Sequence, residues 1–349
     1  MSAKKSEVKL GTFEKYLVLW IPLCMVAGAG LSRYTTIGEA IESLSIRGIS
    51  IPIGLCLFFM MYPAVLNLKG SELRKLKQTP KPILLTVLSN WLVAPLVGFG
   101  LAKLFLSDHE ELFVAVILLS ASPCTAMVLI WGAMANGNQE QNVVNTSLNT
   151  ITIMVFYAPL VALLTGIQDI EIDRWGLLTS VLVFIGLPML LGLLTRKIVI
   201  PWKGEAWFDG VYRPVLGKIS VGALLVTLIV LFALNGTTIM GNPEYLLLIS
   251  VPLLLGFFIV VAFNLLITKL FRLRYREAVV TVIIGSSSHF EIAIATAIAT
   301  YGVGSVAALG TTMGLFWEIP IMLGLVYFSR YLERRGFWSE QPPKGDIIS

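Results

Sequence analysis

Ten long apolar stretches, joined by short polar connections, constrain what this chain can fold into more than any other feature. Only 13% of its 349 residues are charged and 56% are hydrophobic, whereas a soluble protein carries about 25% charged residues. A membrane span needs about 20 apolar residues, and in the water-free bilayer core it must bond its backbone internally, as a helix. We therefore predict an all-α membrane protein with ten spans near residues 15–32, 49–67, 82–106, 112–135, 143–166, 176–195, 217–235, 245–270, 278–300 and 304–329.

The positions of the basic residues predict how these spans are oriented. With an internal N-terminus, 22 of the 26 Lys and Arg lie on the inner side, in both tails and in the basic loops. The outer side keeps Arg33, Arg47, Lys103 and Arg174. This asymmetry is the positive-inside pattern. We expect a multi-pass plasma-membrane protein with both termini cytoplasmic, made of an N-tail at 1–14, one transmembrane domain at 15–335 and a C-tail at 336–349.

The charge pattern also indicates which partners to expect. Basic loops on the inner side can contact anionic membrane lipid. The sequence has no basic face interleaved with aromatic residues, so we expect no nucleic acid partner. A cleaved signal peptide at the first apolar run is the weaker alternative, because the downstream charge pattern requires this span to be retained.

The chain repeats itself once, at an offset of five spans. The tripeptide Lys-Leu-Phe at 103–105 recurs at 269–271, and Tyr-Ala-Pro-Leu at 157–160 resembles Glu-Ile-Pro-Ile at 318–321. Because five is odd, the two halves must insert with opposite orientation. We therefore predict two inverted five-helix repeats, at 15–166 and 176–329, an architecture that many secondary transporters share.

Two interruptions occupy matching places in these halves. The fourth apolar segment contains Ser-Ala-Ser-Pro-Cys at 120–124, and the ninth contains Gly-Ser-Ser-Ser-His-Phe-Glu at 285–291. Proline removes a helix donor, and serine hydroxyls can bond freed backbone groups. Crossed discontinuous helices would present N–H and carbonyl groups to a bound ion. A proline kink beside a small-residue packing face is the structural alternative.

Three side chains near these interruptions could carry chemistry. Glu291 and Glu318 are carboxylates in apolar spans, where ionisable groups are costly and usually face a cavity, so each is a candidate proton carrier. A structural hydrogen bond to a neighbouring helix is the alternative for Glu291, and binding a cation or capping the kink at Pro320 is the alternative for Glu318. Cys124 is a candidate ligand for a soft metalloid, because thiolates bind thiophilic species that oxygen ligands do not. We expect Cys24 and Cys56 to be inert packing residues.

Four amides and a histidine complete the candidate set. The asparagines lie in apolar surroundings at Asn90, Asn145, Asn149 and Asn264. Asn145 and Asn149 are four apart and share a helix face, where they could line a pathway or bond between helices. His289 stands two residues before Glu291 and could pair with it and tune its proton affinity.

Several functional classes are disfavoured by what the sequence lacks. It contains no Walker-type phosphate loop, which disfavours ATP drive, and no Ser-His-Asp or metal-hydrolase spacing. We therefore expect no enzyme and no cofactor, and we favour a carrier driven by an ion gradient. A membrane sensor or non-transporting partner is an alternative of a different class.

Six stretches resemble one transporter family. These are Met-Met-Tyr-Pro at 60–63, Asn-Trp-Leu-Val-Ala-Pro at 90–95, Pro-Cys-Thr-Ala-Met-Val-Leu-Ile-Trp at 123–131, Asn149, Phe-Glu-Ile-Ala-Ile-Ala at 290–295, and Glu-Ile-Pro-Ile-Met-Leu at 318–323. They resemble the arsenite efflux carriers of the arsenical-resistance-3 type, in the bile acid/sodium symporter superfamily. The chain departs from that pattern at Pro123, where many members carry arginine, and at Ser288 and His289, where members usually carry asparagine and phenylalanine.

The resemblance implies a panel domain and a core domain, with the broken helices crossed in the core. It implies proton-coupled export of arsenite, with antimonite as a second substrate. The family's essential cysteine falls on Cys124 and its essential ninth-span glutamate on Glu291. We assign Asn90 and Asn149 to the substrate site, Glu318 to proton coupling, and Ser288, His289 and Asn145 as modulators. The alternative is a sodium-coupled symporter of an organic anion.

Overall fold

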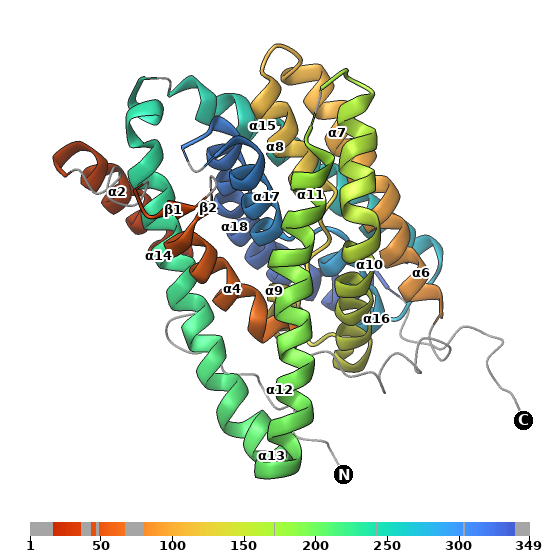
Figure 1. The fold of residues 1–349 in the computed structure, drawn as a ribbon. Helices are drawn as coiled ribbons and strands as arrows, with labels where there is room; N and C mark the ends of the chain where they lie inside the picture. The colour runs from red at the N-terminus through yellow and green to blue at the C-terminus, as the bar shows by residue number, and fades with distance from the viewer. Residues whose placement is uncertain are drawn as a thin grey trace, which may run out of the picture.

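The computed structural model describes residues 17–35, 43–46, 49–66, 80–170, 172–241, 243–302 and 304–338, and it is helical almost throughout (Figure 1). The expected N-tail and residues 339–349 of the expected C-tail lie outside this range. Within it, one departure from an all-α fold is a hairpin of two-residue strands, β1 (Ser45–Ile46) and β2 (Ile49–Ser50), which pair antiparallel.

A helix or a pair of helices occupies each of the ten segments in which the sequence predicts a span, and one short helix, α13, lies between the sixth and seventh segments. In chain order these are α2 (Leu17–Tyr34), α4 (Ile51–Val65), α6 (Pro80–Leu88), α7 (Ala94–Phe105), α8 (Glu110–Ser120), α9 (Met127–Met134), α10 (Gln139–Gly166), α11 (Arg174–Val181), α12 (Leu187–Lys203), α13 (Glu205–Trp207), α14 (Arg213–Gly241), α15 (Glu244–Leu270), α16 (Tyr275–Gly285), α17 (Phe290–Tyr301) and α18 (Val306–Arg334). Six described helical stretches are long and apolar enough to cross a membrane: Pro80–Phe105, Gln139–Gly166, Arg174–Lys203, Glu205–Gly236, Glu244–Leu270 and Val306–Arg334.

Among the described residues, three short π-helical segments interrupt the long helices, and each lies just before a proline. They are η2 (Ser89–Val93), η3 (Leu182–Gly186) and η4 (Phe208–Tyr212), which precede Pro95, Pro188 and Pro214. A proline ring clashes with the carbonyl four residues earlier and leaves it without a donor. In all three cases that carbonyl lies inside the π segment, whose wider turn relieves the clash without ending the helix.

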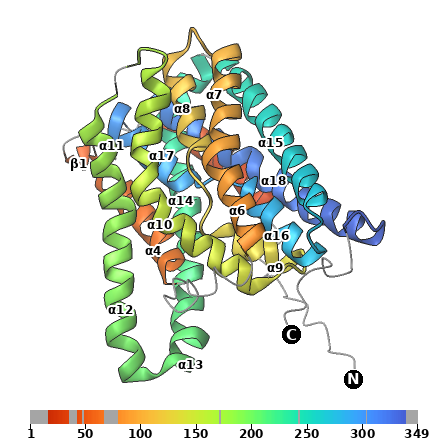
Figure 2. The same ribbon diagram turned by 90° about the vertical axis from the view of Figure 1, so that its right-hand side faces the viewer.

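The sixth and seventh predicted spans are longer than hydropathy indicates. We expect them to end at 195 and to begin at 217, whereas α12 continues to Lys203 and helical structure resumes at Glu205. The basic residues of 196–203 lower the hydropathy there without ending the helix. The turn is made at Gly204, whose φ of 86° is open to glycine. The resulting hairpin of α12, α13 and α14 extends beyond the other helices at one end (Figure 1 and Figure 2).

Two packed groups of helices can be distinguished, and the second contains both interrupted segments. The α14 group consists of α2, α4, α12 and α14, in which α14 packs on α2 and α4, and α12 on α4. The α8 group consists of α7, α8, α9, α15, α16, α17 and α18. Helices α8, α16 and α17 are buried along most of their length. Large apolar side chains are exposed on outer helices instead, such as Leu190 on α12 and Leu247 on α15, which suits contact with lipid.

Candidate functional site

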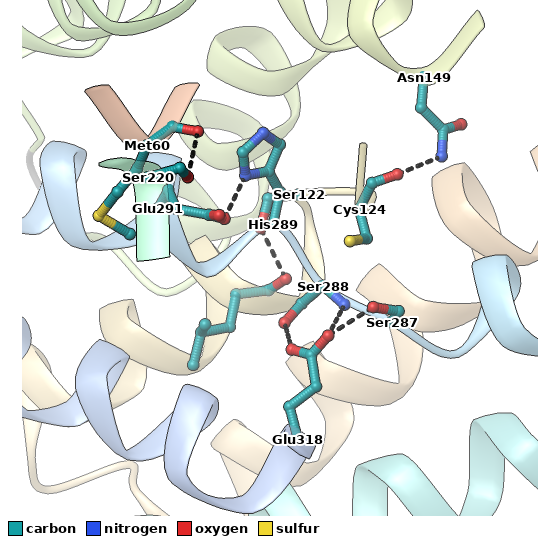
Figure 3. Close-up of polar contacts among 11 residues, drawn as sticks. Met60, Ser122, Cys124, Asn149, Ser220, Ser287, Ser288, His289, Glu291 and Glu318 are labelled. Carbon is teal, nitrogen blue, oxygen red and sulfur yellow. Dashed lines mark hydrogen bonds and ion pairs between the residues drawn. The ribbon is translucent and has the colours of Figure 1, made fainter. Parts of the chain in front are cut away.

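The two interruptions predicted from the sequence are present, and they lie against one another. Helix α8 ends at Ser120 and α9 begins at Met127, while α16 ends at Gly285 and α17 begins at Phe290. Pro123 and Ser288 form an antiparallel bridge. The Cys124 N–H donates to the Ser287 carbonyl at 3.3 Å, and the His289 N–H donates to the Ser122 carbonyl at 2.6 Å. Each break therefore bonds backbone groups that the other leaves free. We call this contact the crossing (Figure 3).

Serine hydroxyls donate to backbone carbonyls at the end of α8, as the sequence indicates. Ser122 donates to the Leu119 carbonyl at 2.9 Å, and Ser120 donates to the Ile117 carbonyl at 3.2 Å. These carbonyls belong to the last turn of α8, where they also accept the N–H groups of Ala121 and Ser122. The hydroxyls therefore stabilise an end that Pro123, unable to donate, could not extend.

A second set of polar groups holds the end of α16. Ser89 in η2 donates to the Gly285 carbonyl at 2.8 Å, and Asn264 on α15 donates to Ser89 at 2.8 Å and to Ser286 at 3.1 Å. A side-chain carbon added at Gly285 would lie 2.8 Å from the Asn264 amide oxygen. Only glycine allows η2 and α15 to approach α16 this closely.

Glu318 is bonded to the second break rather than to its own helix. Its carboxylate accepts hydrogen bonds from the Ser287 hydroxyl, the Ser288 hydroxyl and the Ser288 N–H, the last at 3.1 Å (Figure 3). The side chain is buried. Two of the three serines therefore donate to a carboxylate on α18, whereas we expected them to bond backbone groups freed by the break.

Glu291 has different surroundings, in which His289 is its hydrogen-bonding partner. The His289 Nδ1 lies 2.8 Å from Glu291 Oε2, and both side chains are buried. Glu291 also lines a cavity of about 60 Å³, enough for a small solute or a few waters. The cavity lies between the α14 group and the breaks, and its other lining residues are Met60, Ala126, Met127, Ile130, Trp131, Ser220, Val221, Leu224 and Phe290.

The thiol candidate Cys124 lies at the crossing, and a chain of amides holds its backbone. The Asn149 amide on α10 donates to the Cys124 carbonyl at 3.0 Å, and Asn90 in η2 donates to the Asn149 oxygen at 3.2 Å. Asn145 is one turn away on α10 and donates to Thr86 at 3.1 Å. The structure therefore brings Asn90 and Asn149 to the crossing and places Asn145 against α6.

A second cavity, of about 70 Å³, lies on the other side of the crossing, against α7 and α15. Its polar lining residues are Asn90, Ser120, Ser122, Ser286, Ser287 and Ser288, and apolar side chains such as Val97, Leu253 and Phe257 form the rest of its wall. Cys124 lines neither of the two cavities and is only 3% exposed. The thiol is thus enclosed between them.

Sequence reasoning missed two residues of this arrangement, Ser89 and Ser287. Ser89 stands next to the candidate Asn90, and its position in an apolar segment is the only local signal. Ser287 belongs to a serine run that we interpreted as a helix-weakening element, and its bond to Glu318 joins residues 31 apart in sequence. Within the described ranges, no group of three or more His, Cys, Asp or Glu side chains is placed to hold a metal ion.

Comparison with known proteins places the chain in a family. Residues 54–242 match the model of the sodium bile acid symporter family. A transporter of Synechocystis without an assigned substrate is 37% identical, over 98% of this chain and 94% of its own. The arsenical-resistance protein Acr3 of Alkaliphilus metalliredigens is 31% identical over 92% of this chain and 93% of its own, and that of Corynebacterium glutamicum is 30% identical over 93% and 90%.

These matches cover nearly the whole chain, and they agree with the long apolar helices of the fold. The superfamily expected from the sequence motifs is confirmed, and the family and the long apolar helices fit a multi-pass membrane transporter. This protein belongs to the sodium bile acid symporter family.

Proposed function

We propose that this protein is a secondary carrier of the plasma membrane that exports arsenite, and antimonite as a second substrate, in exchange for protons. Cys124 holds the metalloid transiently, within a substrate site that includes Asn90 and Asn149. Glu291 carries the coupling proton and His289 tunes it. Relatives named for arsenical resistance support this cargo.

One observation carries the proposal, namely the meeting of a thiol and two carboxylates at the crossing. Cys124 comes from the first break, Glu291 from the start of α17, and Glu318 from α18, yet all three are buried around the Pro123–Ser288 bridge. A single thiol can bind a soft metalloid and release it again. A buried carboxylate that faces a cavity can take up and give back a proton.

The proposed architecture is ten spans in two inverted repeats, 15–166 and 176–329, within one domain at 15–335, with both termini cytoplasmic. Two matched breaks that satisfy each other's backbone support the pairing of the fourth and ninth spans. The 60 Å³ cavity supports alternating access, because the α14 group forms one wall and the breaks form the other. Movement of one group against the other, as panel and core, would open this cavity to one side at a time.

The ion gradient provides enough energy for this exchange. Each charge that moves inward down the membrane potential contributes about 2.3 kcal/mol per 100 mV. If protonation of Glu291 and binding of cargo favour opposite-facing states, proton entry drives export of the metalloid.

Arsenite uptake into everted membrane vesicles, energised by an imposed proton gradient, tests the proposal. We expect the wild-type protein to accumulate arsenite, and Cys124→Ser and Glu291→Gln each to abolish accumulation. If well-inserted wild-type protein moves no arsenite, arsenite export is rejected.

The second candidate function is sodium-coupled transport of an organic anion. The 70 Å³ cavity favours it, because hydroxyl and amide oxygens of Asn90, Ser120, Ser122 and 286–288 line one side of the crossing, and hard cations bind oxygen ligands. This function predicts transport that disappears when sodium is replaced by choline and that survives Cys124→Ser.

A further inference from the structure

Ser287 stands between a buried thiol and a buried carboxylate. Its hydroxyl donates to Glu318 Oε1, and its side chain lies beside the Cys124 thiol. The backbone bond from Cys124 N–H to the Ser287 carbonyl, 3.3 Å long, fixes the two residues side by side. All three side chains are at least nine-tenths buried. Ser287 therefore lies beside the thiol and is hydrogen-bonded to the carboxylate (Figure 3).

Ser288, the next residue of the second break, holds Glu318 in position beside Ser287. Ser288 donates to the carboxylate twice, through its N–H to Oε1 and through its hydroxyl to Oε2. The Ser287 hydroxyl and these two Ser288 groups therefore all donate to Glu318. This suits an ionised carboxylate, which can only accept hydrogen bonds. Of these donors, the Ser287 hydroxyl is the one whose residue is also bonded to Cys124, through the Cys124 N–H and the Ser287 carbonyl.

Formation of a metalloid–sulfur bond requires a route by which the thiol can lose its proton. The reactive form of cysteine is the thiolate, and an enclosed thiol has no solvent at hand to take its proton. Enzymes that use a weak nucleophile place a base within hydrogen-bonding reach and fix that base with a further group. Here Glu318 has the place of the base, Ser287 connects it to the thiol, and Ser288 orients it.

We propose that Cys124, Ser287 and Glu318 form a proton relay that makes and breaks the sulfur–arsenic bond during transport. This inference rests on the proposed function and deepens it, because it assigns Glu318 to bond exchange and leaves the coupling proton to Glu291. Glu318 would then act on the cargo step, through Ser287, and not on the driving ion.

The proposed step is balanced in atoms and charge. Neutral arsenous acid, As(OH)₃, approaches the Cys124 thiol, whose proton passes to the Ser287 oxygen while the Ser287 proton passes to Glu318. Sulfur bonds to arsenic, one As–O bond breaks, and the departing hydroxide regains the proton from Glu318 through Ser287 and leaves as water. The products are Cys–S–As(OH)₂ and water, and the reverse step releases the cargo with no net proton change.

The relay is tested by the reactivity of Cys124 toward iodoacetamide, a small neutral alkylating agent, in purified full-length protein. Cys24→Ala and Cys56→Ala form the background, so that only Cys124 reacts. Ser287→Ala and Glu318→Gln each remove one part of the relay. Ser286→Ala is the matched control, because it changes the same serine run but contacts Asn264, not Glu318. Size-exclusion chromatography checks the fold of every variant.

We expect the background protein to be alkylated at a rate that changes little with pH wherever Glu318 is ionised, because the internal base takes the thiol proton, and at a falling rate once Glu318 is protonated. In Ser287→Ala and Glu318→Gln the pH-independent region should be lost: the rate should be lower there by about 10²-fold and should rise with hydroxide concentration. Ser286→Ala should behave like the background. A change in access alone would scale the rate equally at every pH. Identical pH profiles in the background, Ser287→Ala and Glu318→Gln would overturn the relay.

Protection of Cys124 by arsenite separates this inference from the proposed function. In Ser287→Ala, protection by arsenite should form more slowly and disappear more slowly, by the same factor. The arsenite concentration that gives half protection should not change, because a catalyst does not shift an equilibrium. Suppose that arsenite does not protect the background protein from alkylation, but that the pH dependence of the alkylation rate changes in Glu318→Gln. The relay then stands and arsenite is rejected as cargo. If arsenite protects but the profile ignores Glu318 and Ser287, the cargo stands and the relay is rejected.

Discussion

Single residues at the crossing are distinguished by their partners rather than by their type. Glu318 accepts three hydrogen bonds from the second break, whereas Glu291 bonds to His289 and faces a cavity. Both carboxylates could be found from the sequence, because ionisable groups in apolar spans are rare. The pairing of His289 with Glu291 could also be expected, since they are two residues apart. The contact between Ser287 and Glu318 could not, because it depends on how α16 and α18 pack.

The amides provide a residue-scale prediction, in which Asn149→Ala reduces both stability and transport. This change leaves the Cys124 carbonyl and the Asn90 amide without their partner. A buried group that loses its hydrogen bond costs about 1–3 kcal/mol, and the backbone that carries the thiol loses its support. Thermal unfolding in detergent measures the first effect, and arsenite uptake into everted vesicles measures the second.

Asn145→Ala is the control for that prediction, since it removes the same side chain one turn away on α10. Its partner is Thr86, which is outside the crossing. We expect a loss of stability of the same order, with uptake close to that of the wild type. Equal loss of uptake in both variants would mean that α10 acts through its stability alone.

At the scale of elements, hydropathy located the helices, and local chemistry decided their details. Each predicted span contains a helix because apolar segments of this length have few other ways to bond their backbone. The π segments were not predicted, since a proline in a span indicates a kink but not whether the preceding turn widens. The extension of α12 to Lys203 was missed because basic residues end an apolar pattern without ending a helix.

Close packing of α18 on α8 leads to a prediction for the glycines of α18. A side-chain carbon at Gly310 would lie 2.8 Å from the Ala115 Cβ, whereas one at Gly324 would meet nothing within 4 Å. Gly310→Ala must therefore push the two helices apart, and we expect a loss of about 1–3 kcal/mol. Gly324→Ala should leave stability unchanged or raise it by up to about 1 kcal/mol, because alanine favours the helix. Thermal unfolding measures the melting temperatures of the two variants. Equal melting temperatures for Gly310→Ala and Gly324→Ala would contradict the tight α8–α18 contact.

For the whole molecule, the repeat register predicted that the two breaks are neighbours, and the structure places them in contact. The packing of the C-terminal end had no such signal. Trp338 lies beyond the last apolar segment, in the expected C-tail, yet it is buried. Its ring nitrogen donates to Thr268 at 3.1 Å, and the ring packs against Tyr275 at 5.6 Å. A polar stretch after a final span gives no reason to expect a docked tryptophan, because the contact depends on the ends of α15 and α16.

Orientation in the membrane is the prediction that belongs to the molecule as a whole. The α7–α8 connection and the α13 elbow lie at opposite ends of the bundle (Figure 1 and Figure 2). Acidic residues gather at the first end and basic residues at the second, so the positive-inside rule predicts that α13 lies on the cytoplasmic side. In the Cys24→Ala/Cys56→Ala background, a membrane-impermeant maleimide should label Asp108→Cys in intact cells. It should label Lys203→Cys only after permeabilisation.

Both positions are needed, because each gives the opposite result if the chain inserts the other way. Asp108 and Lys203 are both exposed, so a failure to react in intact cells reflects the membrane and not burial. Labelling of Lys203→Cys in intact cells, with Asp108→Cys protected, would reverse the assigned orientation.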